Sequence, residues 1–165
     1  MRTAVYAGTF DPATKGHQWM IAEGASLFDR LLVAVTPNPD KRPFFSIEER
    51  LDLLAELTSE LPNVRVTQAD QRYLVSYAIA NDAAYLLRGI RVASDFEYER
   101  VLRHVNSDIE PQVQTVFLMP PREIAEVSSS LVKGMVGFDG WETTIAKYVS
   151  PAVRDAFLRK VASRG

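Results

Sequence analysis

Five short segments rich in apolar and β-branched residues recur along the chain, and helix-length stretches of mixed polarity separate them. Most of these segments are continuous apolar runs, which is typical of strands buried on both faces of a parallel sheet. We therefore predict a five-stranded parallel sheet with helices on both faces. The expected strands are residues 3–7, 31–36, 64–67, 84–87 and 115–119.

Helical periodicity and capping residues fill the intervals between these strands. Ser46 is followed at capping-box spacing by Glu49, and leucines then recur at helical spacing. Ser94 and Glu97 repeat the capping signature, which predicts a helix from 94 to about 106. Weaker patterns predict helices over 70–81 and 152–161. Strands that alternate with helices in this way indicate a single Rossmann-like α/β domain over residues 1–165, with C-terminal helices from about 142.

Composition agrees with one globular domain and excludes several classes of function. The 165 residues are 47% apolar and 24% charged, and they include no cysteine, which excludes disulfide scaffolds, zinc ribbons and cysteine nucleophiles. The net charge of −2 offers no basic excess for general nucleic-acid binding. Apolar runs fall far short of the ~20 residues that span a bilayer, and the first residues lack the apolar core of a secretory signal. We therefore expect a cytoplasmic protein that binds neither nucleic acid nor membrane.

Ligands of open parallel sheets bind at the carboxyl ends of the strands, so the motifs that directly follow strands carry the functional prediction. The first is residues 8–17, which contains neither a dinucleotide fingerprint nor a nucleotide phosphate loop. One interpretation is a plain strand–turn–helix connection. The other is a phosphate cradle, in which Thr9 and His17 act as donors at the start of a helix.

Two further motifs place cations after the second and fourth strands. Lys41 lies beside Arg42 between prolines, where the two residues are either solvated surface charges or phosphate contacts. Arg88 and Arg91 flank Gly89, and both guanidinium groups can bind phosphate oxygens in a fork. The alternative is an ion-pair network of these arginines with carboxylates at 95, 97 and 99.

Three consecutive serines after the fifth strand form the last motif. Ser128, Ser129 and Ser130 open a helix that also carries Lys133, and serines in that position are most often N-caps. They also offer hydroxyl and backbone donors to a phosphate. Since all four motifs suit anions and all lie at one edge of the sheet, we predict a ligand that carries several phosphates.

These motifs together resemble the bacterial pantetheine-phosphate adenylyltransferases, a family of the nucleotidyltransferases that carry a Thr/His-x-Gly-His motif. That motif is Thr14-Lys15-Gly16-His17 here, and the resemblance extends from residue 3 to about 160. Residues 88–91, 95–99, 104–106 and 128–133 carry the more family-specific part of it. It implies a nucleotidyltransferase fold and transfer of an adenylyl group from ATP to 4′-phosphopantetheine. The products would be dephospho-coenzyme A and pyrophosphate.

The resemblance also implies roles for individual residues and partners. Mg²⁺ would accompany ATP without protein side-chain ligands, coenzyme A would act as a feedback inhibitor, and the chain would form a homohexamer. His17 would stabilise the transition state, with Lys41, Arg88 and Arg91 as further catalytic cations. Residues implied for phosphopantetheine are Thr9, Lys41, Leu74, Arg88 and Asn106, and those for ATP are Thr9, Phe10, His17, Gly89, Ile90, Arg91, Glu99, Ile124, Ala125, Glu126, Val127, Ser128, Ser129 and Ser130.

The chain departs from the family pattern at several positions. Ala7 replaces a common proline, Gln18-Trp19 replaces Leu-Asp, and Ser76 and the segment 124–127 also differ. Two other interpretations therefore stand beside the first one. One is a nucleotidyltransferase for another phosphorylated acceptor, such as nicotinamide mononucleotide or glycerol phosphate. The other is a non-catalytic nucleotide-binding module, for which ATP would bind without release of pyrophosphate.

Overall fold

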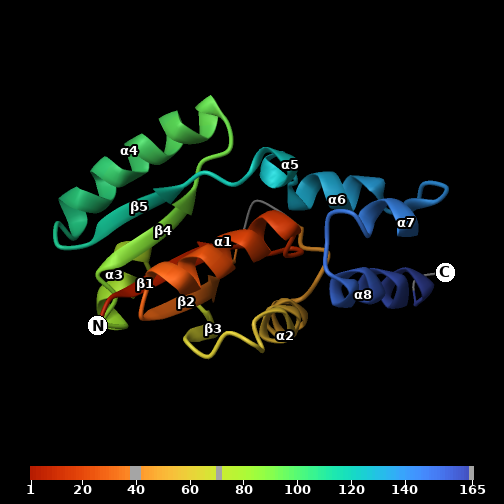
Figure 1. Cartoon of the computed structure of the whole chain (residues 1–165), viewed down its shortest axis with the longest axis horizontal. Helices are drawn as coiled ribbons and strands as arrows, with labels where there is room; N and C mark the ends of the chain where they lie inside the picture. The colour runs from red at the N-terminus through yellow and green to blue at the C-terminus, as the bar shows by residue number, and fades with distance from the viewer. Residues whose placement is uncertain (38–41, 70–71, 164–165) are drawn as a thin grey trace.

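A computed structural model describes residues 1–37, 42–69 and 72–163 of the chain. Within these residues a five-stranded parallel sheet has the order β3-β2-β1-β4-β5 (Figure 1). The prediction of a five-stranded parallel α/β fold is therefore confirmed. The strands are β1 (Thr3–Gly8), β2 (Arg30–Val35), β3 (Val64–Gln68), β4 (Tyr85–Gly89) and β5 (Gln114–Leu118).

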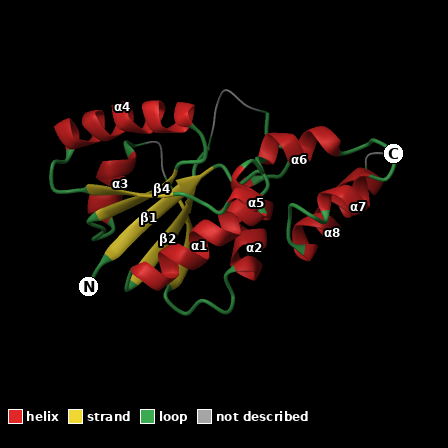
Figure 2. Ribbon diagram, turned by 45° about the horizontal axis from the view of Figure 1, so that its top comes forward, coloured by secondary structure: helices red, strands yellow, loops and turns green. Residues whose placement is uncertain are grey.

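Alternate residues of the central strands are buried on opposite faces of the sheet. Ala4 and Tyr6 of β1 face a cluster with α1 (Lys15–Leu27) and α2 (Ile47–Leu57). Val5 and Ala7 face a second cluster, where α3 (Leu74–Ala80) and α4 (Ala93–Ile109) cover the sheet (Figure 2). Burial on both faces explains why the central strands are continuous apolar runs.

The remaining helices extend beyond the carboxyl edge of the sheet. They are α5 (Arg122–Ala125), α6 (Ser129–Met135), α7 (Trp141–Ile145) and α8 (Pro151–Ala162). The last three pack around a third apolar cluster, in which Phe157 of α8 meets Phe45 with ring centroids 4.9 Å apart. This cluster therefore ties the C-terminal helices to the segment that enters α2. The single-domain organisation of residues 1–165 stays a prediction.

Capping was predicted correctly for α2 and wrongly for α4. Ser46 caps α2 by accepting a bond from the Glu49 amide, while the Glu49 carboxylate accepts one from the Ser46 amide at 2.6 Å. In α4 the N-cap is Val92, and Ser94 lies inside the first turn. Asp95 performs the equivalent function, since its carboxylate accepts a bond from the Arg91 amide at 3.0 Å. The helix accordingly begins one residue earlier than expected and continues to 109 instead of 106.

The helix expected over 70–81 begins at Leu74, and residues 70 and 71 lie outside the described part of the chain. The C-terminal helix starts at Pro151 with Ser150 as its N-cap. Among the described residues, no helix has both the length and the apolar character needed to cross a bilayer.

Candidate active site

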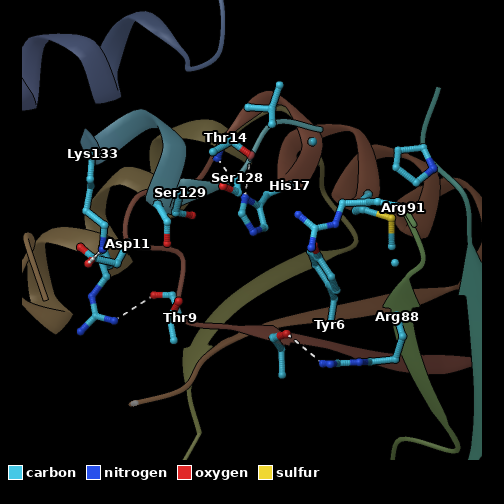
Figure 3. A pocket seen from close by; sticks show the side chains of 18 of the residues that line it. Tyr6, Thr9, Asp11, Thr14, His17, Arg88, Arg91, Ser128, Ser129 and Lys133 are labelled. Carbon is cyan, nitrogen blue, oxygen red and sulfur yellow. Dashed lines mark hydrogen bonds and ion pairs between the residues drawn. The ribbon is translucent and has the colours of Figure 1, made fainter. Parts of the chain in front are cut away.

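A cleft of about 500 Å³ opens at the carboxyl edge of the sheet. Its walls come from the turn after β1, the start of α1, the segment before α2, the end of β4 and the start of α6 (Figure 3). Segments that are distant in the sequence meet here, because the carboxyl ends of parallel strands lie at one edge. The cleft contains most of the anion-binding candidates.

His17 is held in one tautomer at the centre of this cleft. Its Nδ1 accepts a hydrogen bond from the Thr14 amide at 3.0 Å and lies 2.9 Å from the Thr14 hydroxyl. A backbone N–H can only donate, so Nδ1 carries no proton and the neutral ring carries its proton on Nε2. Burial and the nearby charge of Arg91 lower the pKa of His17 to about 4. His17 is thus a neutral Nε2–H donor at pH 7.

Phe10 packs against the His17 imidazole from the core and is not among the residues that line the cleft. It is buried, with its ring centroid 5.2 Å from that of His17 and 5.5 Å from that of Tyr6, both in edge contacts. Its φ of 46° is left-handed, so the turn after Gly8 reverses sharply at this residue. This turn brings Thr9 to the cleft and directs the Phe10 ring into the core.

Arg88 extends from the end of β4 and forms a fork on the carboxylate of Glu99 in α4. Its Nε lies 2.9 Å and 3.0 Å from the two Glu99 oxygens, and Nη2 lies 2.5 Å from one of them. Nη1 lies 3.5 Å from the Ala7 carbonyl, which also lines the cleft. The pair aims the guanidinium along the cleft floor, and Glu99 is buried beside it.

Arg91 lies two residues before α4 and pairs with Asp95, which is one helical turn before Glu99. Its Nε donates to Asp95 at 3.0 Å, and the Asp95 carboxylate also accepts the Arg91 backbone amide. The ion-pair network considered from the sequence is therefore present for Arg88 and Arg91. The network orients both guanidinium groups, which still line the cleft. The two interpretations of this motif are compatible.

All three serines line the cleft, and Ser128 and Ser129 lie beside His17 (Figure 3). Ser128 caps α6 by accepting the Leu131 amide at 3.1 Å, and Ser129 donates to the Pro12 carbonyl at 2.7 Å. Gly16 of α1 lies close to the same part of the chain, since a Cβ built on it would be in ordinary van der Waals contact with the Ile124 carbonyl oxygen at 3.4 Å. The start of α6 is thus bound to the turn after β1.

Asp11, Lys133 and Arg50 also line the cleft, although no role was assigned to them from the sequence. Asp11 forms an ion pair with Lys133, and Arg50 donates to the Thr9 carbonyl at 2.8 Å. Asp11 lies within the motif at residues 8–17, and Lys133 lies in the helix that the three serines open. Their place in these two motifs could have indicated that they belong to the site. The contacts of Arg50 had no signal in the sequence.

The cleft collects some of the expected site residues and excludes others. Leu74 packs into the cluster beneath α3, and Asn106 lies about two turns beyond Glu99 on the same side of α4. Lys41 lies outside the described residues. The roles of all these residues stay predictions. Expected residues that line the cleft are Thr9, His17, Arg88, Gly89, Arg91, Glu99, Ile124, Val127, Ser128, Ser129 and Ser130; those that do not line it are Phe10, Leu74, Ile90, Asn106, Ala125 and Glu126.

The described residues include no group of three or more potential metal ligands from histidine, cysteine and carboxylate side chains. The two buried carboxylates of the cleft are already paired, Asp11 with Lys133 and Glu99 with Arg88. The described side chains therefore do not form a cage for a divalent cation.

A parallel sheet that carries cationic and hydroxyl side chains at its carboxyl edge is compatible with a nucleotidyltransferase, and comparison with known proteins identifies the chain as a member of that class. Residues 5–135 match the family model described as cytidylyltransferase-like. A nicotinic acid mononucleotide adenylyltransferase structure from Plasmodium falciparum aligns with a TM-score of 0.69 at 15% identity, covering 96% of this chain and 95% of that one. This likeness concerns the fold.

Curated relatives are more similar and span nearly the whole chain. The phosphopantetheine adenylyltransferase of Neisseria meningitidis serogroup C is 56% identical over 157 residues, covering 95% of this chain and 92% of the relative. That of Chromobacterium violaceum is 54% identical over 153 residues, covering 93% of both. The chain belongs to the cytidylyltransferase-like family and, within it, to the phosphopantetheine adenylyltransferases. The resemblance inferred from the sequence is confirmed.

Proposed function

We propose that the cleft transfers the adenylyl group of ATP to 4′-phosphopantetheine. A phosphate oxygen of the acceptor forms a bond to the α-phosphorus of ATP, and the bond from that phosphorus to the bridging oxygen of the β-phosphate breaks. Pyrophosphate leaves with the electron pair, and dephospho-coenzyme A remains. Membership of the phosphopantetheine adenylyltransferases supports the two substrates. This reaction is a step of coenzyme A biosynthesis.

The nucleophile needs no general base. A phosphate monoester has a second pKa near 6, so the acceptor is mostly dianionic at pH 7. The principal barrier is the repulsion between this dianion and the triphosphate. Arg88 and Arg91 supply positive charge along one side of the cleft, and the neutral Nε2–H of His17 supplies a donor to the α-phosphate as its charge develops.

The roles proposed for the remaining residues follow their places in the wall. Thr9 and Arg88 are proposed to bind the acceptor phosphate, and Arg91 and the serines are proposed to bind the nucleotide; all of them line the cleft. The observation that carries the proposal is the convergence of His17, Arg88 and Arg91 on one cleft, each held by a buried or charged partner. Preorganisation of this kind removes reorganisation from the chemical step.

Mg²⁺ is proposed to enter as the complex with ATP and to neutralise phosphate charge. Feedback inhibition by coenzyme A and a cytoplasmic location stay predictions.

The decisive experiment is a coupled pyrophosphate assay with ATP and 4′-phosphopantetheine. We expect release of pyrophosphate that depends on the acceptor, at least 100-fold above a control without acceptor. Nicotinamide mononucleotide and glycerol phosphate serve as competing acceptors. Faster turnover with either of them would contradict the choice of substrate, and ATP binding without turnover on any acceptor would contradict catalysis.

We also propose that the chain assembles through α4 into the hexamer that the family resemblance implies. Tyr98, Val101 and Val105 recur at helical spacing and form one stripe, and each is more than 40% exposed. An apolar stripe of this kind is typical of a contact between subunits.

Val101→Glu is expected to dissociate the assembly, because association would bury an unpaired charge. Light scattering coupled to gel filtration measures the mass. Arg103→Glu, on another side of the same exposed helix, serves as the control and should leave the mass unchanged. A monomeric wild-type protein would contradict the proposed assembly.

A further inference from the structure

The Asp11 carboxylate joins three chain segments beside the cleft. Its Oδ1 accepts the Phe45 amide at 2.8 Å, and its Oδ2 accepts the Phe44 amide at 2.9 Å and lies 2.6 Å from the Lys133 ammonium nitrogen. Both oxygens are therefore engaged, and the side chain is almost completely buried. The Asp11 carboxylate therefore links the turn after β1 to the Phe44–Phe45 segment and to α6.

The three connected segments carry different parts of the cleft wall. Asp11 lies in the turn after β1, which carries Thr9 and leads to His17. Phe44 and Phe45 lie between β2 and α2, directly after Pro43 of the wall. Lys133 belongs to α6, whose first residues, Ser129 and Ser130, also line the cleft. Figure 3 shows Lys133 reaching down from α6 to Asp11.

Among the described residues, two polar links join α6 to the turn after β1. The hydroxyl of Ser129 donates to the Pro12 carbonyl, which is the neighbour of Asp11. The Asp11–Lys133 ion pair lies one turn further along α6 and connects to the same turn. Together with the apolar packing of Val132 in the third cluster, these two bonds hold α6 against the turn that leads to His17.

The ionised state of Asp11 agrees with this arrangement. Burial by itself would raise its pKa, but the bonds from Lys133 and from the Phe44 and Phe45 amides hold the pKa below its usual value. Asp11 is therefore charged throughout the neutral pH range. The ammonium group of Lys133 therefore has a charged partner in Asp11.

We infer that Asp11 is a positioning residue for adenylyl transfer, acting through Lys133 and the Phe44–Phe45 amides to set the wall segments relative to His17. The inference rests on the proposed function, since the quantity it controls is the alignment of the two substrates. In-line transfer is sensitive to placement, because displacements of about 1 Å cost on the order of 100-fold in rate. Asp11 itself touches no reacting atom in this role.

The substitution Asp11→Asn keeps the size and the acceptor oxygen but removes the charge that holds Lys133. We expect kcat to fall at least tenfold, while the KM values for both substrates change less than fivefold. Turnover is expressed per ATP-binding site counted by calorimetry, so that unfolded protein does not contribute. An Asp11→Asn variant within threefold of wild-type kcat would contradict the inference.

Lys133→Gln and the double variant test whether Asp11 acts through its partner. A shared function predicts non-additive losses, with the double variant no slower than Asp11→Asn alone, because the amide side chains can bond to each other. Losses that multiply would show that the two residues act independently and would overturn the inference.

A matched control exists at the opposite edge of the sheet. Asp29 accepts the Arg2 amide at 2.6 Å and pairs with the Arg2 guanidinium at 3.4 Å, but the pair is exposed. Asp29→Asn therefore removes a similar set of bonds far from the cleft, and kcat should stay unchanged.

Hydrogen exchange gives a readout that is independent of turnover. In Asp11→Asn, the amides of Phe44 and Phe45 and those of α6 should exchange faster, while those of α3 should keep their rates. Unchanged exchange in α6 would contradict the bracing function of Asp11, even if the enzyme used another acceptor. An inactive wild-type enzyme would contradict the proposed function alone.

Discussion

His17→Ala is expected to lower kcat at least 100-fold with a small change in the affinity for ATP. The neutral Nε2–H is preorganised by the Thr14 amide, and a donor that acts mainly on the transition state contributes on the order of 3–4 kcal/mol. Steady-state kinetics with both substrates measure kcat, and calorimetry measures ATP binding. A kcat within tenfold of wild type would contradict the role of His17.

The pH profile provides an independent test of the same residue. Because its pKa is lowered to about 4, His17 stays neutral as pH falls from 8 to 6, so it causes no loss of rate in that range. A decline near pH 6 would come from protonation of the acceptor phosphate. The His17→Ala variant should therefore show the same decline in rate near pH 6, although its rate is lower at every pH. If the decline near pH 6 were absent in His17→Ala, the group that titrates there would be His17, which would contradict the prediction.

The same lowered pKa affects stability in a defined direction. The unfolded chain takes up a proton at His17 near pH 6.5, and the folded protein does so only near pH 4. The contribution of His17 is thus present above pH 6.5 and is lost as pH falls towards 4.

Arg88→Met is expected to have the second largest effect, on both stability and turnover. Removing the guanidinium leaves the buried Glu99 carboxylate without its forked partner, at a cost of about 3 kcal/mol. Loss of a charged donor to the acceptor phosphate should lower kcat/KM for phosphopantetheine by about 100-fold, since such bonds contribute up to about 3 kcal/mol. Denaturant unfolding and acceptor titration measure the two effects.

A compensating variant separates these effects. Arg88→Met combined with Glu99→Gln should recover much of the stability, because the uncompensated buried charge is gone, while kcat/KM stays low. Recovery of turnover together with stability would show that Arg88 only supports the fold. Arg2→Met, which breaks the exposed pair with Asp29, is the control and should alter neither quantity.

Local sequence patterns predicted the elements of this fold better than their junctions. The strands were recognisable because both faces of the sheet are covered, which makes the central segments continuously apolar. The α2 cap followed from Ser46 and Glu49 alone, since both members of a capping box lie within four residues. At α4 the same spacing of Ser94 and Glu97 misled, because Asp95 bonds back to the Arg91 amide.

The site was predictable in its motifs and not in its connections. Thr9, His17 and the serines could be placed at one edge because each motif follows a strand. The bonds of Asp11 could not, because its partners Phe44 and Lys133 are 33 and 122 residues away. Such contacts depend on how the C-terminal helices pack, and no local pattern encodes that packing.

Arg88 and Arg91 take their counter-ions from a single helix. Asp95 and Glu99 lie one turn apart on α4 and hold Arg91 and Arg88 respectively. A tilt of α4 would displace both carboxylates together, so it would shift both guanidinium groups at once. The electrostatic potential over the bound phosphates would consequently change in one step, as a property of the whole helix.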